Sequence, residues 1–259
     1  MHDLIFALPY QTVGLLLFAA FCAGIVDSIA GGGGLITVPA LLLAAVPPLN
    51  ALATNKVQGA FGAATAAVTY AARGHVDLRR QLWPALGAFL AALAGASAVR
   101  FVPTDALRLT LPVILIGIAL FFAMKPGLSD QDRAERLRPA AFALTMVPLV
   151  GFYDGLVGPG AGSFYMIAFV LLAGHGILRA TAHTKLLNLA SNLGGLAGFV
   201  IAGAPLWGLG LAMGLAQMAG ARIGSRVAMR VGARLIKPLL VVTSTTLALR
   251  LLWQMMSGQ

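Results

Sequence analysis

The feature that most limits the fold of this chain is its amount of apolar sequence. Of its 259 residues, 59% are hydrophobic and only 10% are charged. A soluble domain carries roughly 25% charged residues. Apolar runs long enough to approach or cross a hydrocarbon core of about 30 Å lie at 81–101, 105–124, 186–203, 206–224 and 235–253. The sequence therefore predicts an all-α fold, a polytopic transmembrane helical bundle.

The net charge of +10 is concentrated in short connectors between the apolar runs. Its clearest members are Arg73, Arg79, Arg80, Arg133, Arg136 and Arg138. Such connectors are typical of loops held on the cytoplasmic side of a membrane. This distribution favours a lipid bilayer over nucleic acid as the partner of the basic residues. The single cysteine, Cys22, excludes an internal disulfide.

Two halves of the chain resemble one another. The stretch GIVDSIAGGGGLITVP begins at Gly24, and GFYDGLVGPGAGSFYMI begins at Gly151. Further on, ATNKVQ in the first half answers AHTKLLN in the second, each placing a lysine inside an apolar stretch. We therefore expect a first transmembrane repeat at 1–125, a charged cytoplasmic linker at 126–138 and a second repeat at 139–259.

Each repeat contains five apolar segments. They are 4–29, 35–47, 51–72, 81–101 and 105–124 in the first, and 139–157, 162–174, 182–203, 206–226 and 234–255 in the second. The second segment of each repeat has 13 residues, which is about 20 Å of helix and too short for an easy crossing. These two segments are expected to be broken or re-entrant half-helices.

Loop charges give two ways to thread these segments. If 73–80, 125–138 and 222–237 are cytoplasmic, each short segment must change sides and the two repeats run in opposite directions. Inverted repeats of this kind are common in secondary transporters. If the short segments re-enter, eight full spans remain and the repeats are parallel. We expect inverted repeats, with about eight full spans and two half-helices among ten segments.

Asp27 and Asp154 are the acidic residues inside the apolar segments, at equivalent positions of the repeats. A carboxylate at the membrane centre costs about 2.5–3.5 kcal/mol. One explanation is that each caps the helix that starts at the following glycine turn, or lies at the membrane interface. The alternative is a proton-coupling carboxylate beside a substrate path, because burial favours the neutral form.

Lys56 and Lys185 are the second repeated pair, each among polar neighbours. A lone lysine near a helix end could extend its ammonium group to the interface. Equivalent placement in two repeats favours a shared role instead. Each lysine could neutralise the aspartate of its own repeat, or hold an anion in the transport path.

The glycine turns, Gly31 to Gly34 and Gly158 to Gly162, interrupt helices where helices are expected. Backbone groups left unpaired at such turns must face protein or a water-filled cavity. Helix N-termini at Leu35 and Ser163 would offer free N–H groups and a positive dipole end to an anion. Glycine runs also permit tight helix packing, which is the alternative explanation.

Enzymatic motifs are weak in this sequence. The histidines lack the paired spacing of a metal site, and GAGSFYM around Ser163 does not match the nucleophile elbow. No lysine–serine ending of a nucleotide-binding loop follows the glycines. The sequence predicts no enzyme, no metal site and no cofactor.

The motifs GIVDSIAGGGGLITVPALLL, LNALATNKVQG, GFYDGLVGPGAGSF and ATAHTKLLNLASN resemble the sulfite exporter TauE/SafE family, also described as the toluene sulfonate uptake permease group. The resemblance covers nearly the whole chain. It implies a multi-pass permease of the bacterial inner membrane that moves sulfur-containing anions such as sulfite, sulfoacetate or another organosulfonate. Similar proteins are described as exporters and as importers, with about eight spans.

The sequence thus predicts a secondary transporter for a small oxyanion, working by alternating access. Asp27 and Asp154 are the expected proton-coupling residues. The expected substrate contacts are Gly31, Gly32, Gly33, Gly34, Thr54, Asn55, Lys56, Gln58, Gly158, Gly160, Gly162, Ser163, His183, Thr184, Lys185 and Asn188. The alternatives are a passive anion channel and a non-transporting membrane assembly subunit. Gly87, Gly95, Gly210 and Gly214 are compatible with close packing in a homodimer.

Overall fold

The computed structural model describes residues 8–77, 79–101, 130–202, 204–232 and 253. Within these ranges the chain is helical and contains no strand. The α-helices are α1 (Tyr10–Ala30), α2 (Gly34–Leu43), α3 (Pro48–Ala71), α4 (Leu82–Ala98), α6 (Pro139–Leu156), α7 (Ala161–Leu171), α8 (Ile177–Ile201) and α9 (Trp207–Val231). Short 3-10 helices, η2 (Arg79–Gln81) and η3 (Val99–Phe101), flank α4. The all-α prediction is confirmed.

Eight of the ten expected segments correspond to these helices. The segment 105–124 and all of 234–255 except Trp253 lie outside the described residues. The two short segments are indeed short, with 10 residues in α2 and 11 in α7. Among the described residues, three helical stretches are long and apolar enough to cross a membrane, namely Tyr10–Ala30, Arg79–Ala98 and Pro139–Leu156.

Proline and glycine set the ends of several helices. Pro48 and Pro139 occupy first-turn positions of α3 and α6, where the missing N–H would be unpaired in any case. Gly31 ends α1 with a positive φ of 71°, and its N–H donates to the carbonyl of Asp27. Gly160 precedes α7 in the left-handed region, which residues with a Cβ rarely adopt.

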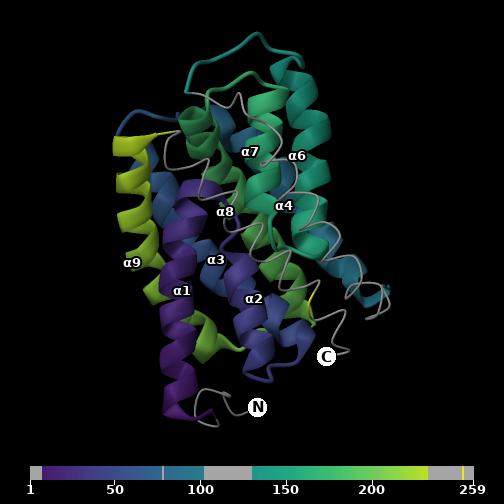
Figure 1. Ribbon diagram of the computed structural model, residues 1–259. Coiled ribbons are helices and arrows are strands. Elements are labelled where there is room, and N and C mark those ends of the chain that lie inside the picture. Colours follow the sequence, from purple (N-terminus) through teal and green to yellow (C-terminus); the bar gives the residue numbers. More distant parts are fainter. Residues whose placement is uncertain (1–7, 78, 102–129, 203, 233–252, 254–259) are drawn as a thin grey trace.

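The helices of the two halves pack in matching pairs (Figure 1): α1 lies against α9, and α6 lies against α4. Both contacts are made at glycines. A Cβ on Gly24 of α1 would stand 2.2 Å from the carbonyl oxygen of Gln217 in α9. A Cβ on Gly95 of α4 would stand 2.1 Å from the carbonyl oxygen of Phe152 in α6. Glycine is therefore required for both close crossings.

At the centre, α3 and α8 contact each other and run antiparallel. Asn50, near the start of α3, donates through Nδ2 to the carbonyl of Ala204, just after the end of α8. Most residues of both helices are buried. Figure 1 shows α1 starting at the end of the bundle labelled N, whereas α6 starts at the opposite end.

The short helices turn back on the helices that precede them. Leu172, which follows α7, accepts hydrogen bonds from the N–H groups of Arg136 and Leu137, just before α6 begins. Leu41 of α2 lies in one apolar cluster with Leu16, against which Leu8 also packs. α2 and α7 thus return toward the ends where α1 and α6 begin, which agrees with the expectation of broken or re-entrant half-helices and not with the threading in which each short segment changes sides.

Most of the glycines that could permit a homodimer instead pack against other helices of the same chain. Gly95, Gly210 and Gly214 pack against Phe152, Val57 and Phe61. Gly87 alone of the four has open space where a Cβ would be. A stripe of small residues therefore gives no evidence for a dimer here.

Candidate functional site

The two glycine turns meet in the middle of the bundle. A Cβ on Gly31 would lie 2.4 Å from the carbonyl carbon of Gly162 and 2.6 Å from the backbone nitrogen of Ser163. The hydroxyl of Ser163 donates to the carbonyl of Gly31 at 2.9 Å. The turns that precede α2 and α7 are thus brought side by side by direct backbone contact.

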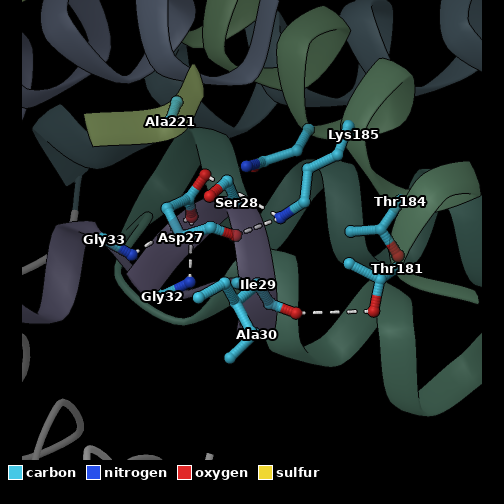
Figure 2. Close-up of polar contacts among 12 residues, drawn as sticks. Asp27, Ser28, Ile29, Ala30, Gly32, Gly33, Thr181, Thr184, Lys185 and Ala221 are labelled. Carbon is cyan, nitrogen blue, oxygen red and sulfur yellow. Dashed lines mark hydrogen bonds and ion pairs between the residues drawn. The ribbon is translucent and has the colours of Figure 1, made fainter. Parts of the chain in front are cut away.

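Asp27 stabilises the first glycine turn by hydrogen bonds. Its Oδ1 accepts from the N–H groups of Gly32 at 3.0 Å and Gly33 at 3.1 Å (Figure 2). The carboxylate therefore holds the turn just before α2, a role close to the capping explanation, but it bonds no N–H within α2 itself. These two amides were expected to face a substrate anion, but in this arrangement the carboxylate of the protein itself occupies them.

Asp154 is held by side chains instead. Lys56 Nζ donates to its Oδ1 at 2.5 Å, and the Ser191 hydroxyl donates to its Oδ2. The side chain of Lys56 packs against Gly158 and Gly195. A Cβ on Gly158 would lie 3.0 Å from Lys56 Nζ, and a Cβ on Gly195 would lie 3.1 Å from Lys56 Cε. Both side chains of the ion pair are almost fully buried, so each requires the other.

Lys185 lies farther from its carboxylate partner than Lys56 does. Its ammonium donates to the backbone carbonyl of Asp27 and lies 3.9 Å from Asp27 Oδ2 (Figure 2). Each lysine therefore pairs with the aspartate of the other half. The alternative in which a lysine neutralises the aspartate of its own repeat is wrong, because the antiparallel α3 and α8 carry each lysine across to the opposite turn.

A small polar cavity lies between the turns. Its lining is Asp27, Gly32, Gly34, Asn55, Gly59, Asp154, Gly158, Gly160, Ala161, Gly162, Asn188, Asn192 and Gln217. It leaves about 20 Å³ for the centres of water molecules, enough for one or two waters. Nine of these residues, including both aspartates, were expected to form the site.

Several expected contacts lie behind the cavity wall. Thr54 Oγ1 accepts from the N–H of Leu206 and so fixes the start of α9. Gln58 donates to Asn55 Oδ1, which also accepts from Thr37. Thr184 bonds the helix carbonyl of Ala180. The expected residues that support the lining and do not form it are Thr54, Gln58, Thr184, Gly31, Gly33, Lys56, Ser163 and Lys185.

His183 is not brought to this cavity. Its Nδ1 lies 2.5 Å from Gln81 Nε2, and its ring lies edge-on to His175 at 4.7 Å between centroids. All three residues line a different cavity beside the linker. Its nearness to Lys185 in the sequence did not predict this position, because His183 lies two residues from Lys185 and faces another side of α8.

Sequence analysis missed Asn192 and Gln217. Asn192 lies one turn after Asn188 on α8 and donates to its backbone carbonyl at 2.7 Å. Gln217 is 2% exposed, and within the described chain its Oε1 has no hydrogen-bond partner. An amide in the otherwise apolar stretch 207–220 of α9 was a signal that could have identified Gln217.

The charges around the cavity cancel. Two carboxylates line it, and two ammonium groups lie immediately behind them. In a low-dielectric site, an uncompensated charge is expensive. Among the described residues, no three histidine, cysteine or acidic side chains gather as metal ligands would.

The sulfite exporter TauE/SafE family model matches residues 16–251. The chain belongs to this family. It is 54% identical over 245 residues to "Probable membrane transporter protein ORF9" of Sinorhizobium sp, covering 95% of this chain and 94% of that protein. Identity is 44% over 241 residues to "Probable membrane transporter protein YfcA" of Escherichia coli strain K12, covering 93% and 90%. No solved structure matches this chain.

A third relative, a "Probable membrane transporter protein" of Haemophilus influenzae, is 36% identical over 241 residues, covering 93% of this chain and 94% of that protein. The family and these relatives make the chain a membrane transporter and not an enzyme. They agree with the resemblance carried by the aspartate, glycine-turn and lysine motifs.

Proposed function

We propose that this TauE/SafE protein is a secondary transporter that moves a small sulfur-containing oxyanion, such as sulfite, sulfoacetate or another organosulfonate, across the bacterial inner membrane. The observation that carries the proposal is the buried polar cavity where the two glycine turns meet. Its amide side chains, glycine backbone and helix N-termini suit the oxygens of such an anion. The arginine-rich connectors would face the cytoplasm.

The proposed mechanism is alternating access between two inverted halves. Re-entry of the short segments was expected to make the repeats parallel, but three features support the inversion all the same: α3 and α8 are antiparallel, α1 and α6 start at opposite ends, and their packing partners α9 and α4 correspond. The cavity holds only one or two waters, so a sulfonate could enter only after the halves move apart on one side. A rocking motion of this kind is common in such transporters.

Charge balance supports proton coupling through Asp27. An incoming monoanion would leave the four cancelling charges with one net negative charge, and a proton would restore neutrality. Both oxygens of Asp154 accept hydrogen bonds from side chains. Within the described part of the chain, the partner of Asp27 Oδ2 is the distant ammonium of Lys185, 3.9 Å away, so it is the oxygen best placed to take the proton.

The first test measures thermal stability of the purified protein in detergent against sulfite, sulfoacetate, toluene sulfonate, sulfate and carboxylates. A ligand of the folded form raises the apparent melting temperature by mass action. We expect a saturable rise with one sulfur oxyanion, lost in Asn188→Ala. The exposed-site variant Gln11→Ala is the control. No rise with any anion would contradict the proposal.

The coupling test follows uptake of that anion into proteoliposomes under an imposed pH gradient. Asp27→Asn should abolish the dependence on the gradient, whereas unchanged dependence would refute proton coupling. A passive channel would instead give uptake that does not saturate and ignores the proton gradient. A non-transporting assembly subunit would tolerate substitution of Asp27 and Asn188 without any change in ligand response.

A further inference from the structure

A basic cavity lies at one end of the bundle, where the connector after α3 passes beside the last turn of α9 (Figure 1). Its volume is about 320 Å³, and the described residues that line it are Arg73, His75, Arg226, Met229 and Arg230. Pockets for small molecules start at about 300 Å³. The cavity shares no lining residue with the central cavity or with the cavity beside the linker.

Helix and turn geometry bring the cationic side chains together. The two arginines of α9 are four residues apart and therefore share one face of that helix. Opposite them, α3 ends in a turn in which the N–H groups of Arg73 and His75 both donate to the carbonyl of Tyr70. Gly74 between them has a φ of 74°, which glycine adopts without strain. The connector thus folds back and carries both of its side chains to the cavity.

The charge of this cavity is unbalanced. Its three guanidinium groups remain charged at any physiological pH, and its described lining contains no acidic residue. Within the described chain, no ion pair involves Arg73, Arg226 or Arg230. The C-terminal ends of α3 and α9 lie here, and each carries about −0.5 elementary charge. Together they offset about one of the three positive charges.

Asp130 is the acidic residue that could reduce this charge further. It lies beside the end of α9, where a Cβ on Gly232 would stand 2.4 Å from its Oδ2. However, it does not line the cavity, and its Oδ1 accepts from the N–H of Leu178 at the start of α8. Even one full carboxylate would leave a net positive charge, so the cavity favours an anion.

A phosphate group matches both the charge and the donors. The planar guanidinium group binds phosphate oxygens through paired hydrogen bonds, and a phosphate monoester carries about −1.5 to −2 charge at pH 7. Met229 packs against the apolar core and adds an apolar wall between the two arginines of α9. An ester, which joins carbon atoms to the phosphate, suits this mixed lining better than a bare inorganic ion.

We propose that this cavity is an anion site for a phosphate ester. The phosphate binds between Arg73 of the connector and Arg226 and Arg230 of α9, and the carbon atoms of the ester contact Met229. The headgroup of an anionic lipid and a free phosphate ester share this chemistry. In the proposed orientation the site faces the cytoplasm, where anionic headgroups are exposed. Because these arginines come from opposite halves of the chain, a bound phosphate links the two halves.

The test uses the full chain in a neutral detergent at about 0.15 M salt, where attraction between exposed charges is largely screened beyond about 8 Å. Phosphorus NMR follows line broadening of glycerol 3-phosphate, with protein-free micelles as the blank. Native mass spectrometry follows retention of phosphatidylglycerol, with the zwitterionic phosphatidylcholine as the comparison. We expect saturable binding of one molecule per chain. Binding of the lipid alone assigns the site to a headgroup, and binding of glycerol 3-phosphate alone assigns it to a free ester.

Matched arginine variants locate the binding. Arg226→Gln and Arg230→Gln should each weaken binding about tenfold, because each removes a charge-assisted hydrogen bond. Both side chains are exposed, so neither change should affect folding. Arg79→Gln removes an exposed arginine of the same connector that lies outside the lining, and it should bind as the unaltered chain does.

Asn188→Ala separates this site from the central cavity, which Asn188 lines. It should retain binding of the phosphate ester, whatever its effect on sulfur oxyanions. Loss of phosphate binding in Asn188→Ala would instead assign the ester to the central cavity and overturn the proposal. Equal losses in Arg79→Gln and Arg226→Gln, or no saturable binding of either probe, would overturn it as well, because the arginines would then form only a solvated surface.

Discussion

At the scale of single residues, two lysines in equivalent sequence positions have different surroundings. Lys56 forms a short, fully buried ion pair with Asp154. Lys185 donates to a backbone carbonyl and lies farther from the Asp27 carboxylate. The pattern Thr-Asn-Lys against His-Thr-Lys predicted that both lysines matter. It could not predict this difference, because the partners come from the other half of the chain.

The first prediction concerns the Lys56–Asp154 pair. Lys56→Met should lower the free energy of unfolding by about 3–5 kcal/mol, since Asp154 is then buried without a partner. Adding Asp154→Leu should recover most of that loss. Thermal and denaturant unfolding in detergent measure both, as a double-mutant cycle. Additive losses would show that the two side chains do not stabilise each other.

The second prediction concerns pH. Burial lowers the pKa of His175 from 6.5 to about 4 in the folded protein, so the unfolded chain binds a proton first as pH falls. Stability from this group is complete above pH 6.5 and declines toward pH 4. The slope is limited to about 1.4 kcal/mol per pH unit for one proton.

The matched variant for this pH effect is His175→Phe, which keeps an aromatic ring against Phe169. It should flatten the curve of melting temperature against pH between 6.5 and 4. An unchanged curve in the variant would assign the acid sensitivity to other groups.

At the scale of elements, the glycine turns decide the site. Four consecutive glycines predicted a break between two helical pieces, and α1 and α2 are separated there. The sequence could not show that one turn packs directly on the other. That contact excludes any side chain at Gly31, where φ is 71°.

The third prediction compares two glycines of the same helix region. Gly31→Ala should destabilise the protein by about 2–5 kcal/mol, from the positive φ and the clash with Gly162. Gly14→Ala meets nothing within 4 Å and should be neutral or stabilise α1 by about 0.5–1 kcal/mol. Unfolding of the two variants in detergent tests this, and equal effects would contradict the packing argument.

At the scale of the whole molecule, the proposed inversion assigns each end of the bundle to one side of the membrane. The connectors with Gly74 and Arg133 belong to one end. Pro47 and Ala202 belong to the other, where Asn50 bonds Ala204. In this proposal, the positive charge of its connectors puts the first end in the cytoplasm.

The fourth prediction tests this orientation with single cysteines introduced in a Cys22→Ala background. Pro47→Cys and Ala202→Cys should react with a membrane-impermeant maleimide in intact cells. Gly74→Cys and Arg133→Cys should react only after lysis. Labelling of all four from one side would refute the arrangement.

The sequence alone determined the helical class, the paired aspartates and lysines, and the two short helices after glycine turns. These follow from local chemistry: apolar length, charges that are expensive in lipid, and residues that break helices. The tertiary structure decided which lysine pairs with which aspartate and that α2 and α7 turn back. It also decided that Gln217 and Asn192 line the cavity, whereas His183 lies outside it. These outcomes depend on antiparallel packing between distant segments, and no spacing within either half encodes that packing.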